Sequence, residues 1–142
     1  MATGPVVKQI LAAYSGKIRL VIKNYPYKYR DFARIAAEAS LAAADQGKYW
    51  EMHDILITRS PELDRTKLIS YAQELGLDVA QFTAAIDNGK NAAKIDADIK
   101  LAESMDLYNT PTFYINGRQV IGERPFDYFK KVIDEELAKA GG

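Results

Sequence analysis

The N-terminal part of the chain shows two different spacings of apolar residues. After Pro5, apolar residues recur every three or four positions until Ser15-Gly16. A helix tolerates proline in its first turn. This spacing predicts a helix over about Pro5–Tyr14. Between Lys17 and Tyr25, Ile18, Leu20 and Ile22 alternate with residues that would lie on the opposite face of a strand, namely Arg19, Val21 and Lys23. Pro26 ends the pattern. The alternation predicts a strand with one strongly apolar face.

The middle of the chain, from Asp31 to Asp106, shows no alternating pattern, and its apolar residues fall into helical runs with recognisable ends. Asp64 can cap one of these runs, and Asp78 with Gln81 three residues later indicates a capping box. The predicted helices are about Asp31–Ala44, Lys48–Thr58, one between Asp64 and Gly76, one between Asp78 and Asn88-Gly89, and one around Ile95, Ile99 and Ala102.

The C-terminal part returns to a strand pattern. An aromatic and β-branched run from Thr110 to Ile115 stops at Asn116-Gly117, and Asn-Gly is the strongest short-range signal of a hairpin. A returning strand over Gln119–Gly122 is therefore predicted. Pro125 then opens a last helix with a single apolar stripe.

Composition narrows the class of protein. The 142 residues, 48% of them apolar, suffice for one domain with an insertion. The 19 basic side chains balance the 19 acidic ones, so no excess charge favours a nucleic acid or an anionic membrane as partner. We expect no membrane span and, from Met1–Gly4, no signal peptide. With no cysteine, the chain lacks disulfides, thiolate metal ligands and a thiol nucleophile.

Four phrases of the sequence, in this order, are similar to phrases of the DsbA-like thiol:disulfide oxidoreductases: Pro5–Leu11, Arg19–Pro26, Tyr49–Asp54 and Asn109–Gly117. The resemblance covers nearly the whole chain, from Pro5 to Leu137. It implies an α/β fold in which a thioredoxin-like sheet of the DsbA type carries an inserted all-helical subdomain. The thioredoxin-like domain would comprise residues 1–30 and 107–142, and the helical subdomain residues 31–106.

The chain departs from this family at its start. The family places a Cys-x-x-Cys five residues before a proline that resembles Pro5, so its second cysteine would fall just ahead of Met1. The resemblance thus implies an N-terminally truncated fold without the first strand, and Met1–Gly4 is interpreted as a replacement start. In the family that strand lies between the strands that resemble Lys17–Tyr25 and Thr112–Asn116.

An absent central strand would leave unpaired backbone groups on both of its neighbours, which is costly in water. Three repairs are conceivable: the two neighbours pair directly, they exchange strands with a second copy, or a partner supplies a strand. We favour self-association through the open sheet edges, so that a homo-oligomer is the expected partner state.

Thr110 and Pro111 are the candidate site residues. The family resemblance implies a cis Thr-Pro bond and a backbone at Thr110 that pairs with a peptide substrate. From the residues alone, Pro111 is an ordinary trans start of a strand, and a purely structural turn is the simpler interpretation. A peptide or protein substrate is the partner that this site would take, and no catalytic residue, metal ligand or cofactor is predicted.

Two other features have simple interpretations. His53 is the only histidine and has no converging partner in the sequence, so a packed structural role is favoured over a zinc or catalytic site. Tyr25, Tyr27 and Tyr29 with the neighbouring Lys28 and Arg30 resemble in composition a nucleic-acid platform. The balanced charge argues against that function, and we expect a loop that packs its rings on the helices.

The sequence therefore predicts a DsbA-family protein that is redox-inactive in this form. Thiolate attack on a disulfide needs a sulfur that no serine or threonine replaces. The alternative is a noncatalytic peptide-binding or self-assembling module. A glutathione-dependent activity without redox chemistry ranks last, since no serine stands in the cysteine position. The resemblance implies a periplasmic or secreted location.

Overall fold

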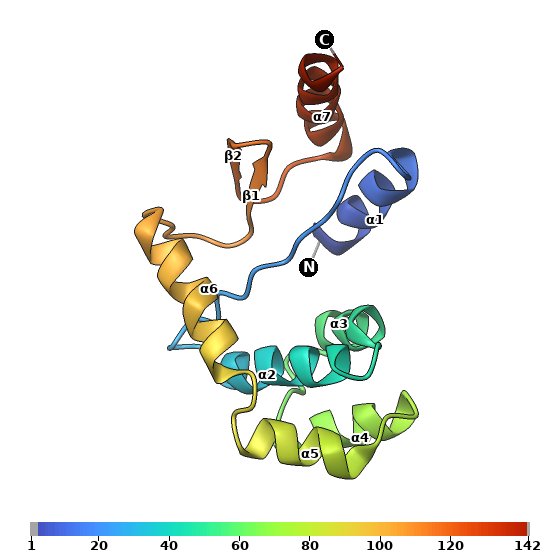
Figure 1. Cartoon of the computed structure of the whole chain (residues 1–142), viewed down its shortest axis with the longest axis vertical. Coiled ribbons are helices and arrows are strands. Elements are labelled where there is room, and N and C mark those ends of the chain that lie inside the picture. Colours follow the sequence, from blue (N-terminus) through green and yellow to red (C-terminus); the bar gives the residue numbers. More distant parts are fainter. Residues whose placement is uncertain (1–2, 142) are drawn as a thin grey trace. The chain divides into compact units, whose positions relative to one another are not determined.

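The computed structural model describes residues 3–141, so Met1, Ala2 and Gly142 lie outside the account of the fold, including half of the start interpreted above as a replacement. The chain divides into two compact units (Figure 1). A helical unit comprises Lys23–Met105. A sheet unit contains the chain up to Ile22 and from Asp106 onward.

The helical unit is organised around α2, whose residues from Ala36 to Ala43 are all buried. The helix packs against each of the other four helices of the unit, because its alanine side chains let neighbouring backbones approach closely. Phe82, Met52 and Leu68 are fully buried in the main core. The unit contains α2 (Ala33–Ala44), α3 (Tyr49–Thr58), α4 (Arg65–Glu74), α5 (Val79–Asp87) and α6 (Ala92–Ser104).

The predicted helix caps are confirmed in one case and half right in the other. The Asp64 carboxylate accepts the backbone N–H groups of Thr66 and Lys67, at 3.0 and 3.2 Å. Asp78 accepts the N–H of Gln81 at 2.9 Å, but the reciprocal bond of a capping box is absent. Instead the side chain of Gln46 accepts the Asp78 N–H at 2.8 Å, because the end of α2 lies against this turn.

The sheet unit holds one antiparallel hairpin and two helices. Strands β1 (Thr112–Ile115) and β2 (Arg118–Ile121) are joined by Asn116-Gly117, both at positive φ, 48° and 88°. These angles fit the two-residue turn that the Asn-Gly signal predicts. The helices α1 (Thr3–Ala13) and α7 (Phe126–Ala140) pack on each other, and the core of the unit contains Ile10, Tyr14, Val120, Phe129 and Ile133.

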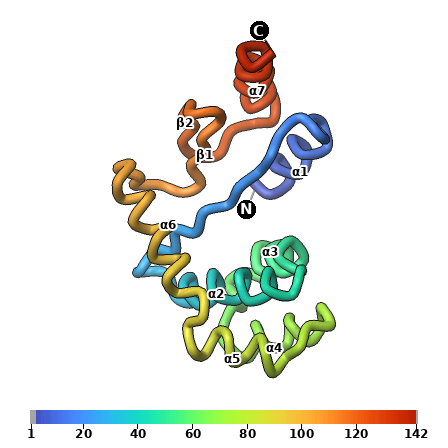
Figure 2. Tube along the Cα trace, viewed as in Figure 1, coloured from blue at the N-terminus to red at the C-terminus, as the bar shows by residue number. Residues whose placement is uncertain are grey.

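The strand predicted over Lys17–Tyr25 is wrong. The only sheet among the described residues has the two strands β1 and β2, and residues 18–27 belong to no regular element. Figure 2 shows residues 18–22 as a drawn-out trace after α1. Burial still alternates along this segment, with Ile18, Leu20 and Ile22 half-buried and the residues between them exposed. The side-chain pattern is therefore realised, but a strand also needs a neighbour to bond to, and none is present.

One of the three conceivable repairs was direct pairing of Lys17–Tyr25 with Thr112–Asn116. Among the described residues these two segments are not paired.

The first helix of the helical unit also begins later than expected. The sequence suggests a start near Asp31, whereas α2 starts at Ala33. Phe32 precedes it with φ 63° and ψ −2°, a left-handed conformation that L-residues with large side chains rarely adopt. Within the described part of the chain, no helix combines the length and apolar character needed to cross a membrane.

Candidate functional site

The Thr110–Pro111 bond is cis and lies immediately before β1. Thr110 is exposed and Pro111 half-buried. The carbonyl oxygen of Pro111 accepts the N–H of Gly122 at 2.8 Å, so Pro111 continues the hydrogen-bond ladder between the two strands. The candidate residues are thus the first step of the hairpin and not an isolated turn.

The hairpin register determines which backbone groups of β1 remain available. In an antiparallel pair, hydrogen-bonded and non-hydrogen-bonded residue pairs alternate. Since Pro111 and Gly122 are hydrogen-bonded, the bonded pairs that follow are Phe113–Val120 and Ile115–Arg118. Thr112 and Tyr114 are the non-hydrogen-bonded positions between them. Their N–H and C=O groups therefore point away from β2.

The outward backbone groups of Thr112 and Tyr114 form one row, which begins two residues after Thr110. We call this row the β1 edge. No turn, loop or side chain among the described residues bonds to it. Sequence reasoning found Thr110 but missed Thr112 and Tyr114. The length of the Asn116-Gly117 turn was a usable signal, because a two-residue turn fixes the bonded pairs.

The two faces of β1 differ in character. Phe113 and Ile115 pack into the core of the sheet unit, and the Phe113 ring meets Phe129 edge to face at 4.8 Å between centroids. On the opposite face Tyr114 is 40% exposed, and its hydroxyl accepts a hydrogen bond from Gln119 at 2.7 Å. A strand placed beside the β1 edge would therefore meet one apolar and one polar face.

The segment Ile18–Ile22 is a second row of unpaired backbone in the same unit. No backbone hydrogen bond to these residues occurs among the described ones. Ile18 nevertheless packs in the core that also holds Phe113 and Ile115. The sheet unit therefore contains two extended stretches that share a core but no ladder.

Ionisable groups in the sheet unit are held in structural contacts. The hydroxyl of buried Tyr14 lies 2.5 Å from the Asp134 carboxylate, and Lys130 pairs with the same group at 2.6 Å. Burial raises the pKa of Tyr14, and the neighbouring carboxylate raises it further. The hydrogen bond from Lys130, followed by that from Tyr14, holds the pKa of Asp134 below its usual range. These contacts fasten α1 to α7 and offer no activated base.

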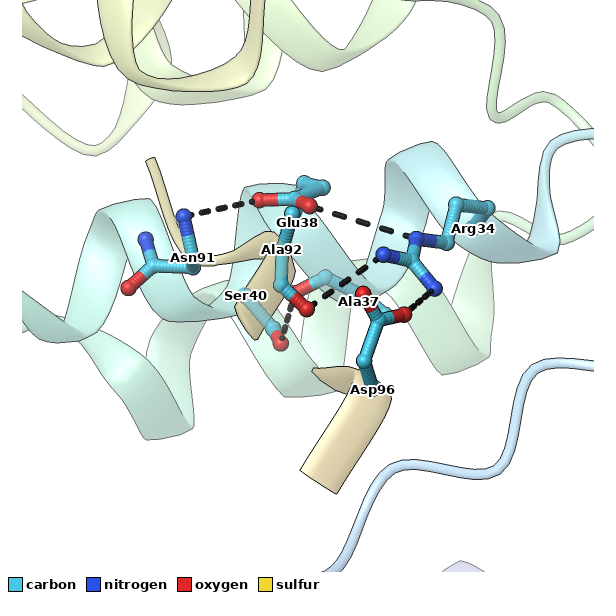
Figure 3. A network of polar contacts seen from close by, with 7 residues as sticks. All are labelled: Arg34, Ala37, Glu38, Ser40, Asn91, Ala92 and Asp96. Atoms are coloured by element: carbon cyan, nitrogen blue, oxygen red, sulfur yellow. Dashed lines mark hydrogen bonds and ion pairs between the residues drawn. The ribbon is translucent and has the colours of Figure 1, made fainter. Parts of the chain in front are cut away.

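The helical unit contains a polar network between α2 and the start of α6, shown in Figure 3. Glu38 is 5% exposed and accepts the N–H of Asn91 at 3.2 Å. Arg34 lies 4.0 Å from the Glu38 carboxylate and binds Asp96 at 2.7 Å. Burial raises the pKa of Glu38, although the Asn91 bond and Arg34 oppose the rise. The Ser40 hydroxyl in this network donates to the carbonyl oxygen of Ala37 in the same helix at 2.8 Å, and the other contacts join α2 to the start of α6, so the role of the network is structural.

Asp98 is an anchoring residue that sequence reasoning missed. It is 5% exposed, binds the Lys23 ammonium at 3.0 Å and accepts the Asn24 N–H at 2.9 Å. These bonds hold the start of the helical unit on α6. The usable signal was spacing, since Asp98 lies three residues after Ile95 and four before Ala102, on the apolar stripe of the helix.

His53 lies among aromatic rings, stacked on Tyr49 at 5.8 Å and edge-on to Trp50 at 5.6 Å between centroids. In residues 3–141 no group of three or more histidine, cysteine, aspartate or glutamate side chains is arranged to hold a metal ion. The candidate residues Thr110 and Pro111 lie at the start of the hairpin, directly before the outward positions Thr112 and Tyr114.

Known proteins share the fold of this chain. The family model described as "Thioredoxin" matches residues 3–135. A thioredoxin-like oxidoreductase from Silicibacter pomeroyi DSS-3 is 27% identical, with a TM-score of 0.84 over 95% of this chain and 77% of that one. The thiol-disulfide exchange protein alpha-DsbA2 from Wolbachia pipientis is 23% identical, with a TM-score of 0.83 over 94% of this chain and 73% of that one. At that identity, the second comparison shows the fold alone.

Among curated proteins, the chain is similar to part of several much longer ones named as Na(+)/H(+) antiporters. It is 34% identical to NhaA 3 of Salinispora tropica over 96% of this chain and 21% of that protein. For NhaA of Herminiimonas arsenicoxydans, the identity is 38% over 78% of this chain and 18% of that protein. The chain thus spans about a fifth of these relatives, as the 21% and 18% show.

The predicted fold class is confirmed by the family match and by the structural neighbours. Helices and a small sheet are arranged as in DsbA-type proteins, while the 142 residues contain no cysteine for thiol exchange. The chain belongs to the thioredoxin family, as a member with a DsbA-like fold and no cysteine among its 142 residues.

Proposed function

We propose that this chain is a noncatalytic DsbA-like module that binds an extended peptide along the β1 edge. Thr110 and Pro111 of this chain lie at the start of that edge. The observation that carries the proposal is the row of outward, unpaired backbone groups at Thr112 and Tyr114, directly after Thr110 and Pro111 in the chain. An unpaired sheet edge binds a peptide by adding it as a further strand.

The two faces of β1 indicate which peptides fit. Side chains of an added strand alternate between the faces. One set would extend the apolar surface of Phe113 and Ile115, and the other would lie beside exposed Tyr114. The preferred ligand is therefore an extended peptide with alternating apolar and polar residues. It is bound and released unchanged, because the chain has no sulfur for a mixed disulfide.

A second copy of this chain is the alternative occupant, and the segment Ile18–Ile22 favours it. That segment is extended, alternates in burial and has no backbone partner among the described residues. It is itself the kind of strand that the β1 edge accepts. Homo-oligomers would then form through open sheet edges. Membership of the DsbA-like proteins supports a periplasmic or secreted place of action for either form.

The test is amide hydrogen exchange by NMR, with a capped peptide of the chain's own residues 17–25 as the probe. We expect the amides of Thr112 and Tyr114 to gain protection, while those of Phe113 and Ile115 are already protected by β2. Protection that rises with chain concentration in the absence of peptide would identify the second copy as occupant. Thr112 and Tyr114 amides that stay unprotected under both conditions would refute the proposal.

Matched proline variants decide which edge of the hairpin is used. Tyr114 and Gln119 face each other as a non-hydrogen-bonded pair, so each directs its N–H out of the hairpin. Tyr114→Pro removes a donor from the β1 edge, and Gln119→Pro removes one from the opposite edge. We expect only the first variant to abolish protection of Thr112 by the peptide. Loss in the second variant alone would place binding on β2.

A further inference from the structure

The helical unit carries an open groove that the β1 edge does not involve. The groove encloses about 680 Å³ and lies between the segment before α2, α2 itself, the end of α5 and α6. Its lining includes Tyr27, Lys28, Arg30, Phe32, Ile35 and Ile99. Its volume is in the range of sites that hold a few side chains of a ligand.

The groove has an apolar floor with an exposed aromatic ring beside it. Ile35 and Ile99 are half-buried lining residues that pack on the helical cores. Phe32 is 47% exposed and adopts a left-handed backbone at φ 63°. Such a conformation is unfavourable for a bulky residue and is found disproportionately at binding sites. Much of the ring therefore remains open to a ligand side chain.

The aromatic surface continues along the segment in front of α2. Tyr27 and Tyr29 stack at 5.1 Å with an interplanar angle of 12°, and Tyr29 is 76% exposed. The expectation that this loop packs its rings on the helices thus fails for Tyr29. Stacking on Tyr27 holds the exposed ring in place beside the groove.

The charges of the groove leave an excess of free cations. The acids that line it are already engaged: Asp87 forms two 2.7 Å bonds with Arg65, and Glu38 binds Asn91. In contrast, Lys28 and Arg30 form no ion pair within residues 3–141.

Figure 3 shows that Arg34, a third basic lining residue, is turned to Asp96 and Glu38, so it adds no free charge. Asp31, which stands between Arg30 and Phe32 in sequence, is not among the lining residues.

We propose that this groove binds an acidic segment of a partner protein, in which an apolar or aromatic side chain is flanked by carboxylates. The apolar side chain lies on Phe32, Ile35 and Ile99. The carboxylates pair with Lys28 and Arg30. Two free cations suit a short acidic peptide but not a nucleic-acid strand, whose binding depends on neutralising many phosphates. The site is independent of the strand-binding function proposed for the sheet unit.

The test is an NMR titration of the full chain with the capped peptide Glu-Glu-Phe-Glu-Glu, a Lys-Lys-Phe-Lys-Lys counterpart and a short single-stranded oligonucleotide. We expect shifts of the amides of residues 26–35 and Ile99 with the acidic peptide, and weaker binding as salt is raised. Absence of saturable shifts with that peptide, equal binding of its lysine counterpart, or tighter binding of the oligonucleotide in the same groove would overturn the proposal.

Charge reversal with a matched control locates the contact. Lys28→Glu with Arg30→Glu should weaken binding of the acidic peptide by about tenfold or more. Lys17→Glu with Lys131→Glu makes the same change of net charge at two exposed lysines of the sheet unit and should leave binding within about twofold. Equal losses in the two double variants would show an effect of net charge alone and overturn the proposal.

Phe32→Asn separates binding from folding, because asparagine tolerates the left-handed conformation. Circular dichroism should show a folded chain of unchanged helical content. The affinity for the acidic peptide should fall by about fivefold or more. An Asn variant that keeps the wild-type affinity would exclude Phe32 from the site.

Discussion

The helices of Lys23–Met105 and the hairpin of the sheet unit satisfy their backbones in different ways. A helix bonds to itself within four residues, so α2 and the four helices around it close a core without help from distant segments. A strand bonds only to a neighbour. In the sheet unit, β1 has one neighbour and Ile18–Ile22 has none. The same chain thus combines a region complete by itself with a region whose edges remain open to another strand.

The two cores differ accordingly. Phe82, Met52 and Leu68 in the helical unit are each 0% exposed. In the sheet unit, Phe113 and Ile115 pack on the core but stay only partly buried. Both cores also have partly buried members, and Phe129 of the sheet unit is only 2% exposed, so the cores differ in size: among the described residues the main helical core has 11 buried members and the sheet core has 5. The following variants test this contrast.

The largest expected effect is that of Phe82→Ala in the closed core. Removing a fully buried phenylalanine should cost about 3–5 kcal/mol of unfolding free energy. Urea unfolding measures the loss, followed by Trp50 fluorescence for the helical unit and by the NMR signals of the β1 amides for the sheet unit. Phe129→Ala is the matched variant of the sheet unit, and we expect a smaller loss because its partly exposed neighbours can close over the gap. An equal or larger loss for Phe129→Ala would contradict the contrast.

Asp98→Ala should detach the start of the helical unit from α6. The change removes the acceptor of the Asn24 N–H and the partner of Lys23 and should cost about 1–3 kcal/mol. Amide exchange of Asn24 should speed up in parallel. Asp96→Ala removes a carboxylate of the same helix that is 54% exposed, and it should cost less than about 1 kcal/mol. An Asn24 amide that exchanges no faster in the Asp98 variant would refute the anchoring role.

Glu38→Gln should change how stability depends on pH. The pKa of Glu38 is raised in the folded state, so the folded chain binds more protons than the unfolded one above the ordinary value of 4.5. Its contribution to stability is therefore full below that value and is lost as pH rises through the raised pKa. Glutamine accepts the Asn91 bond and does not titrate. Unfolding measured at several pH values should show the variant gaining on the wild type towards neutral pH, whereas a constant difference would contradict the assignment.

The smallest expected effect is that of Phe32→Asn on stability. Relief of the left-handed strain, about 1–2 kcal/mol, offsets the loss of a ring that is 47% exposed. The unfolding free energy should change by less than about 1 kcal/mol. A loss comparable to that of Phe82→Ala would show that Phe32 is a core residue.

What the sequence predicted correctly follows from local physics. The helices were visible because their apolar residues repeat at helical spacing, and the hairpin because Asn116-Gly117 permits two positive φ angles. The strand over Lys17–Tyr25 was wrong because an alternating pattern specifies a face and cannot supply the neighbour that makes a ladder. The left-handed Phe32 at the start of α2 left no local signal.

The candidate site was only partly visible. Thr110 and Pro111 were found through the family resemblance, whereas Thr112 and Tyr114 needed the register of the hairpin. The groove of the helical unit was missed because Ile99 and Phe32 are far apart in sequence, and no local pattern indicates that they line the same surface.

The Asn116-Gly117 turn has a consequence for how this protein can change. Because the turn is two residues long, it sets the phase of the whole ladder, and with it the choice of Thr112 and Tyr114 as the outward positions. One inserted residue would shift β2 out of phase, so that bonded and free amides exchange places unless a bulge absorbs it. Loops elsewhere can lengthen at little cost. In this turn, one inserted residue would change both the strand pairing of the hairpin and the backbone groups that its edge exposes.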